Sequence, residues 1–150
     1  MQASPFKFPA NDALKECITN FEDAVKHFNA IKQAMSEFKN VLKAYSNTIK
    51  IQLEERTNTT NIMQRQKLKD LLFKYIEESQ KHVAGGRIYD LLQDLKVLTR
   101  EILSVTSIRD EQDILKNMEG LNQKISDDLA DILAKMVNLY SSLGKLSKAV

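Results

Sequence analysis

The side chains best suited to chemistry in this chain are two histidines and one cysteine, and their spacing does not assemble a reaction centre. His27 and His82 lie far apart, and neither has a second histidine three or four residues away or the Glu-x-x-His spacing of di-iron bundles. We therefore predict no metal site. Cys17 lies beside Ile18, near an apolar stripe, with no identifiable base, so we expect a buried, unreactive thiol.

Three aspartates near the end of the chain, Asp127, Asp128 and Asp131, form a D-D-x-x-D pattern. This pattern resembles the motif that holds Mg²⁺-diphosphate in isoprenoid synthases, which are helical but much longer and usually carry a second metal-binding motif. No second motif is visible here, and the sequence has no glycine-rich phosphate loop. We interpret the aspartates as an acidic, solvated helix face and predict neither an enzyme nor a cofactor.

The most unusual pattern is basic. Four lysines step by seven, four and seven residues: Lys32, Lys39, Lys43 and Lys50. On a helix they fall within about 20° of one line, roughly 100° from the apolar stripe. One interpretation is a solvated flank whose lysines lie along the protein surface, and the other is a binding stripe for anionic lipid or an acidic partner. Aromatic residues do not interleave with this line, so we do not predict nucleic-acid binding.

The element that carries these lysines is a predicted helix over 12–56, which contains no Gly or Pro and has apolar residues at steps of three and four. Its apolar stripe is not continuous. The residues from Leu14 to Phe28 share one line, whereas those from Ile31 to Leu53 lie about 80–100° around the helix. No residue between them breaks helices. We therefore expect one long helix that meets different neighbours on either side of Asn29. The alternative is a helix that breaks at Asn29-Ala30 and folds back.

The whole chain is predicted to be an all-α, antiparallel up-down bundle. The expected helices are 12–56, 61–84, 87–105 and 108–143, with an extended N-terminal arm over 1–11 and a C-terminal tail over 144–150. Gly85-Gly86 is expected to end the second helix in the left-handed region, and Gly144 to end the fourth. The alternative is three long helices, 12–56, 61–105 and 107–143, with the glycine pair as a kink.

Composition supports a single helical domain, because Gly (4) and Pro (2) are too scarce for a fold rich in turns. Residues 61–87 are basic and residues 88–143 acidic, so we expect these segments to face each other within the bundle. A single cysteine suits a reducing compartment. With no signal peptide or continuous apolar span visible in the sequence, we expect a cytoplasmic protein, peripheral at a membrane if the lysines bind lipid.

The unequal helix lengths give the functional prediction. The short second and third helices can cover only part of the first and fourth, so residues 12–30 and 125–143 should pair alone. We expect a partner interface there, with a protein or a second copy, at Phe21, Val25, Phe28, Met136 and Tyr140. The leading hypothesis is a non-enzymatic interaction or oligomerisation module. The rival is a membrane-acting bundle, since the layout loosely resembles the N-terminal helical bundles of cell-death effectors and plant resistance proteins.

Overall fold

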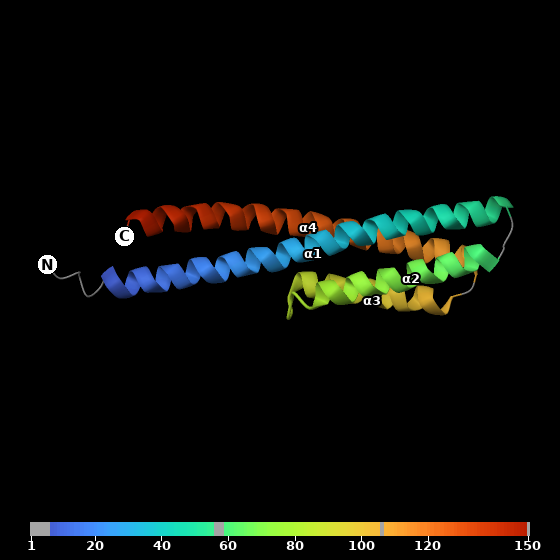
Figure 1. The fold of residues 1–150 in the computed structure, drawn as a ribbon, viewed down its shortest axis with the longest axis horizontal. Helices are drawn as coiled ribbons and strands as arrows, with labels where there is room; N and C mark the ends of the chain where they lie inside the picture. The colour runs from blue at the N-terminus through green and yellow to red at the C-terminus, as the bar shows by residue number, and fades with distance from the viewer. Residues whose placement is uncertain (1–6, 56–58, 106, 150) are drawn as a thin grey trace.

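The computed structural model describes residues 7–55, 59–105 and 107–149, and every regular element within these ranges is an α-helix. The helices are α1 (Lys7–Glu55), α2 (Thr59–Gln80), α3 (Arg87–Ser104) and α4 (Ile108–Ala149). They form the predicted antiparallel four-helix bundle (Figure 1). Because α2 and α3 are separate helices that pack against each other, the three-helix alternative is wrong.

Both ends of the domain are more helical than predicted. Helix α1 begins at Lys7, so the predicted extended arm is wrong for residues 7–11, while residues 1–6 lie outside the described residues. Pro9 is tolerated because the first turn of a helix has backbone N–H groups without intrahelical partners, so the missing N–H costs nothing there. Helix α4 continues through Gly144 to Ala149, so the predicted tail is wrong as far as residue 149. One Gly inside a helix costs only about 1 kcal/mol relative to Ala.

The connection between α2 and α3 corrects the predicted role of the glycine pair. Helix α2 ends at Gln80, before the glycines, and not at residue 84. Gly86 is the N-cap of α3, with φ 94° and ψ −173°, a conformation that is strained for any residue with a Cβ. Its carbonyl accepts a hydrogen bond from the Asp90 N–H at 3.0 Å, which begins α3. The glycines therefore start the third helix rather than end the second.

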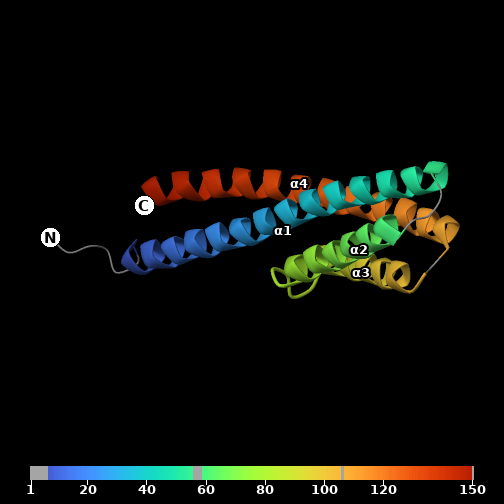
Figure 2. The ribbon, with the colours of Figure 1, turned by 45° about the vertical axis from the view of Figure 1, so that its right-hand side comes forward.

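The helices are covered unevenly along their length. At one end they form a ring in which α1 packs on α2 and α4, and α3 packs on α2 and α4. Toward the other end, α1 and α4 extend well past α2 and α3 and pack only on each other (Figures 1 and 2). Helix α1 passes through Asn29 without interruption, as predicted. The change in its apolar stripe therefore marks a change of neighbours.

The buried core coincides with the part of the molecule where all four helices are present. Among the residues whose burial is described, the buried apolar residues of α1 run from Ile31 to Ile49, and those of α4 from Leu115 to Leu133. The short helices contribute residues such as Leu72 and Leu92, which have no exposed surface. Fully burying such a side chain stabilises the fold by about 1.5–3 kcal/mol. Most of the hydrophobic stabilisation is therefore concentrated at one end.

Candidate functional site

The stretch in which α1 and α4 pair alone is the first candidate site. We call it the two-helix arm and define it as residues 12–30 of α1 and 134–149 of α4. The α4 part starts later than predicted, because Ile125 and Leu129 are fully buried in the bundle core. All five predicted interface residues lie in the arm: Phe21, Val25, Phe28, Met136 and Tyr140. Phe21, Val25, Phe28 and Met136 are half-buried, and Tyr140 is 41% exposed.

The structure brings two of these residues together across the helix pair. Val25 and Tyr140 line a hollow of about 250 Å³ that Glu22, Lys26 and Val137 complete. The Tyr140 hydroxyl donates a hydrogen bond to Glu22 Oε1 at 3.3 Å. Phe28, in contrast, packs against the bundle core and marks the boundary of the arm.

Sequence reasoning missed the most exposed apolar residues of the arm. Val137, Leu139 and Leu146 are 59%, 55% and 53% exposed, more than any predicted interface residue described there. Val137 lies on one flank of the main apolar stripe of α4, and Leu139 and Leu146 lie on the other flank. The signal was present, because Leu139 and Leu146 are seven residues apart and therefore share one line on the helix. The apolar surface of α4 in the arm is thus wider than one stripe.

Three of the four lysines of the stripe line hollows between α1 and α4. Lys32, Lys39, Lys43 and Lys50 are all exposed, as the sequence suggested. Lys39 and Lys43 line a hollow of about 290 Å³ with Glu119, Asn122 and Gln123 of α4. Lys50 lines a neighbouring hollow of about 350 Å³, to which α4 contributes Arg109 and Lys116. Glu119 borders both hollows and accepts a hydrogen bond from Ser46 Oγ at 3.4 Å.

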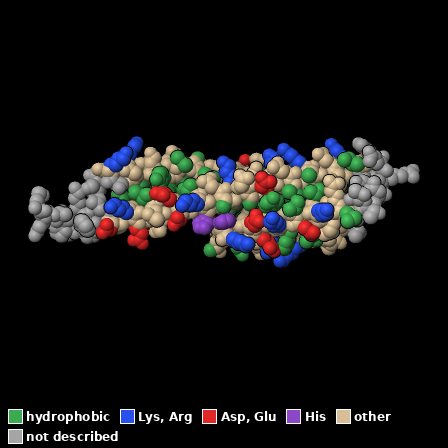
Figure 3. All heavy atoms as spheres, in the orientation of Figure 1, with side chains coloured by type: hydrophobic (Ala, Val, Ile, Leu, Met, Phe, Trp, Pro, Cys, Tyr) green, Lys and Arg blue, Asp and Glu red, His purple; other side chains and the backbone are tan. Residues whose placement is uncertain are grey.

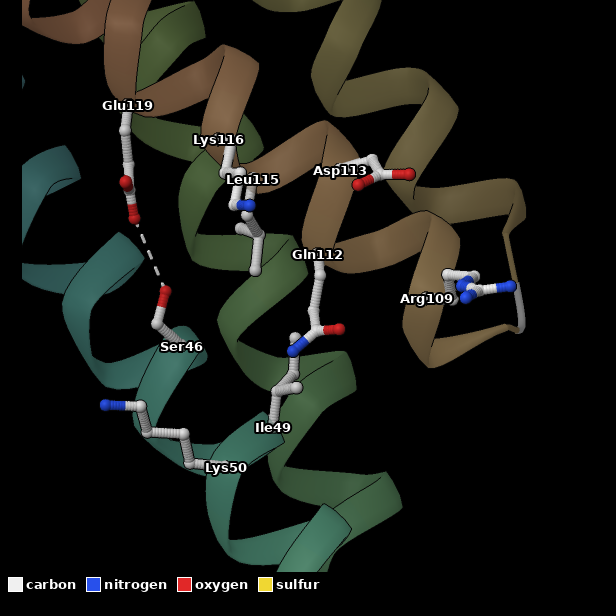
Figure 4. A pocket seen from close by; sticks show the side chains of 9 residues that line it. All are labelled: Ser46, Ile49, Lys50, Arg109, Gln112, Asp113, Leu115, Lys116 and Glu119. Carbon is white, nitrogen blue, oxygen red and sulfur yellow. Dashed lines mark hydrogen bonds between the residues drawn. The ribbon is translucent and has the colours of Figure 1, made fainter.

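The charged groups of the larger hollow do not converge on one point. Figure 4 shows Lys50 and Arg109 directed away from each other, with the Ser46–Glu119 hydrogen bond on one side of the hollow. Two carboxylates, Asp113 and Glu119, also line it and offset part of the positive charge. A small anion would therefore lack a set of converging donors of the kind that strong anion sites use.

The D-D-x-x-D aspartates have separate partners. Asp128 forms an ion pair with Arg87 at 2.7 Å, and Asp131 forms one with Lys135 at 2.9 Å. Asp127 accepts a hydrogen bond from the Gln123 side chain at 2.9 Å. Within the described part of the chain, no group of three or more His, Cys, Asp or Glu side chains could hold a metal ion. The Arg87–Asp128 pair also joins the basic middle of the chain to its acidic last third, as predicted.

A buried charged cluster, which the sequence did not reveal, joins all four helices. Glu111 of α4 has no exposed side-chain surface, and its Oε1 lies 3.0 Å from Lys69 Nζ and 3.3 Å from Arg65 Nη2, both on α2. Lys69 Nζ also donates to the carbonyl of Val105, at the end of α3, at 3.3 Å. Tyr45 of α1 is fully buried beside this group.

The electrostatics of the cluster hold Tyr45 neutral. Burial disfavours the charged phenolate, and the nearby Glu111 carboxylate adds to this, so the pKa of Tyr45 is raised far above its usual range. The charge of Arg65 opposes this shift but is the smaller effect. Because Glu111 is sealed from solvent, no substrate could reach it in this conformation. The cluster therefore fixes how the helices meet.

The structure also brings together the two histidines. His27 Nδ1 and His82 Nδ1 are 2.9 Å apart, and the ring centroids are 5.2 Å apart. Sequence spacing could not show this contact, because His27 is on α1 and His82 is in the connection between α2 and α3. Cys17, predicted to be buried, is exposed, because it lies in the two-helix arm, where only α4 packs against α1.

Comparisons with known proteins add no relative: no protein-family model, no curated protein and no solved structure matches this chain. A search of the described residues for helices long and apolar enough to cross a membrane also found none.

Proposed function

We propose that this protein is a non-enzymatic interaction module that associates with a second copy of itself through the two-helix arm. The observation that carries the proposal is the exposed apolar surface around the hollow between α1 and α4, where Val137 is 59% and Tyr140 41% exposed beside Val25. Leu139 and Leu146 expose a second apolar line on the other flank of α4. Apolar residues scattered singly over a surface are ordinary, but apolar residues that gather around one hollow are typical of an interface.

A second copy fits this surface because, elsewhere in the molecule, α1 and α4 are covered by another antiparallel helix pair. In the bundle, an antiparallel pair of short helices, α2 and α3, completes the ring with α1 and α4. The arm is itself a pair of antiparallel helix segments, about 25–30 Å long at 1.5 Å per residue, close to the length of α3. Two arms packed face to face would therefore form a four-helix bundle at the centre of an elongated dimer.

The charges of the arm favour the same arrangement. Residues 12–30 of α1 carry four acidic and two basic side chains, whereas residues 134–149 of α4 carry three lysines and no acidic residue. A two-fold dimer in which the α1 segment of one copy lies beside the α4 segment of the other places opposite charges together. The reverse arrangement, with like segments in contact, places like charges together.

The test is the solution mass as a function of concentration, by light scattering coupled to small-angle X-ray scattering. We expect an elongated dimer. Val137→Glu should raise its dissociation constant at least tenfold, because the change buries a charge in the interface. Val97→Glu is the matched control: Val97 is a 50% exposed valine on α3, away from the arm, and its replacement should leave the dimer intact. A monomer at all concentrations, or equal effects of the two changes, would refute the proposal.

The second candidate function is binding to an anionic membrane surface through the lysine stripe. Its specific support is that all four lysines are exposed on one helix. Co-sedimentation with phosphatidylserine vesicles, but not with phosphatidylcholine vesicles, should be lost when the four lysines become Glu. A charge-matched control replaces four exposed lysines elsewhere, Lys15, Lys67, Lys74 and Lys124. If the control loses binding equally, net charge and not the stripe is responsible.

A further inference from the structure

The contact between His27 and His82 is close enough to define the chemistry of the pair. Two imidazole nitrogens 2.9 Å apart cannot both direct lone pairs at each other, because these would repel. One nitrogen must therefore donate a proton to the other, or both must bind a shared cation. Figure 3 shows the two histidines together at the surface, where the bundle meets the uncovered stretch of α1, so solvent ions can reach them.

Both histidines are next to residues that pack against the bundle core. His27 lies in the middle of α1, next to Phe28, which packs against the bundle core. His82 follows the end of α2, where its N–H donates to the Ser79 carbonyl at 3.1 Å. The next residue, Val83, also packs against the core. Because both ligands sit on fixed backbone, bringing them together costs little additional conformational entropy on binding.

We propose that His27 and His82 form a two-histidine binding site for a divalent transition-metal ion. A metal about 2.0–2.1 Å from each of two nitrogens at this separation would make an N–metal–N angle of roughly 90°, which suits neighbouring positions of an octahedral or square-planar ion. Water would fill the remaining positions, since the described residues contain no third His, Cys, Asp or Glu grouped with the pair. Among common ions, Cu²⁺ and Ni²⁺ fit these donors and this angle best.

Such an ion would connect α1 to the turn between α2 and α3, at the point where the covered part of α1 ends. Metal bound to the folded state but not to the unfolded chain stabilises the fold. The site therefore provides a way for metal concentration to strengthen the attachment of the α2–α3 pair to α1. His27 lies in the two-helix arm, near its boundary with the bundle, but neither histidine belongs to the exposed apolar surface of α4. Ion binding and dimer formation can therefore be tested separately.

The test is thermal unfolding with NiCl₂ alone, in a Cys17→Ser background that removes the exposed thiol as a competing ligand. We expect Ni²⁺ in large excess over its dissociation constant to raise Tm by about 5–10 °C. His27→Gln and His82→Gln should each abolish most of this rise. Lys81→Gln, a change at an exposed neighbour of His82, should keep the rise, and so should Val137→Glu.

Calorimetry and light scattering complete the test. The expected result is one Ni²⁺ per chain with no change in the mass of the particle, and no such binding in either histidine variant. The proposal fails if Ni²⁺ has no effect on Tm, or if one histidine variant keeps the full rise. It also fails if binding occurs only with an increase in mass, because the ion would then join separate molecules.

Discussion

Helices α1 and α4 run through two regions that differ in their neighbours. In the bundle, α2 and α3 complete a ring, and residues such as Phe38 have no exposed surface. In the two-helix arm the same helices keep an apolar stripe, yet Phe21 is only half-buried and Tyr140 is 41% exposed. An apolar stripe therefore shows which face of a helix seeks a partner, but not whether the same chain supplies one.

The largest expected difference between the two regions comes from removing one phenylalanine from each. Phe38→Ala should lower the free energy of unfolding by about 3–5 kcal/mol, because it leaves a cavity in a closed core. Phe21→Ala should cost no more than about 1 kcal/mol in a dilute monomer, where the half-buried ring loses fewer contacts. Urea unfolding of both variants, at concentrations below dimer formation, measures the difference. Equal losses would mean that the arm is packed as firmly as the bundle.

The buried cluster should also distinguish a closed region from an open one. Glu111→Ala leaves Arg65 and Lys69 buried without their carboxylate, and breaking such a group costs about 3–5 kcal/mol. Glu119→Ala is the matched control, since Glu119 is an exposed glutamate two turns further along α4 and should change stability by less than about 0.5 kcal/mol. Urea unfolding measures both. A small loss for Glu111→Ala would show that water enters the cluster and solvates the two cations.

The sequence was sufficient to predict the fold because that prediction depends on local patterns. Apolar periodicity identified four helices, the change of stripe near Asn29 identified a change of neighbours, and unequal lengths identified the uncovered arm. The errors lie at helix ends. The sequence predicts an extended arm over 1–11 and a helix end at Gly144, yet the first turn of a helix tolerates Pro9 and a long helix can contain one Gly.

The candidate sites were less predictable because they depend on contacts between distant parts of the chain. Glu111 looked like an ordinary acidic residue in a first helical turn, and only packing against α2 shows that it is buried with Arg65 and Lys69. His27 and His82 meet because the turn after α2 lies against α1. A pattern of three or four residues describes one helix at a time and contains no information about such pairs.

The ionisation of Tyr45 makes the stability of the four-helix bundle depend on pH, and this dependence can be tested. Its pKa is raised in the folded state, whereas in the unfolded chain it is about 10. Below pH 10 both states keep the proton, so its contribution to stability is constant. Above pH 10 only the unfolded state loses the proton, so stability should fall by about 1.4 kcal/mol per pH unit. Denaturant unfolding between pH 8 and 11 measures this slope.

The control for this slope is Tyr45→Phe, which removes the titrating hydroxyl but keeps the ring in the core. Above pH 10, the free energy of unfolding of this variant should fall less steeply with pH than that of the original protein. The difference between the two slopes is the contribution of Tyr45. Identical slopes would mean that the hydroxyl ionises in the folded state, which would require water to reach the cluster.

The smallest expected effects come from replacing two glycines of α4, one in the bundle and one in the arm. Gly120 and Gly144 both lie inside α4, and a Cβ added to either meets no atom within 4 Å. Gly120→Ala, in the bundle, should raise the free energy of unfolding by about 1 kcal/mol through helix propensity. Gly144→Ala, in the arm, should change global stability by less than about 0.3 kcal/mol if the arm opens separately. It should instead slow amide exchange in neighbouring residues of α4.

Hydrogen exchange and urea unfolding of the two alanine variants together decide whether the arm is a separate cooperative unit. Equal gains in global stability would show that the arm and the bundle unfold together, because a stabilised helix end contributes to global stability only when it remains folded until the core opens. Unequal gains would show that the arm opens while the bundle stays intact. An arm that opens alone must gain its order from whatever covers it, so dimer formation should then protect the amides around Gly144 more than those around Gly120.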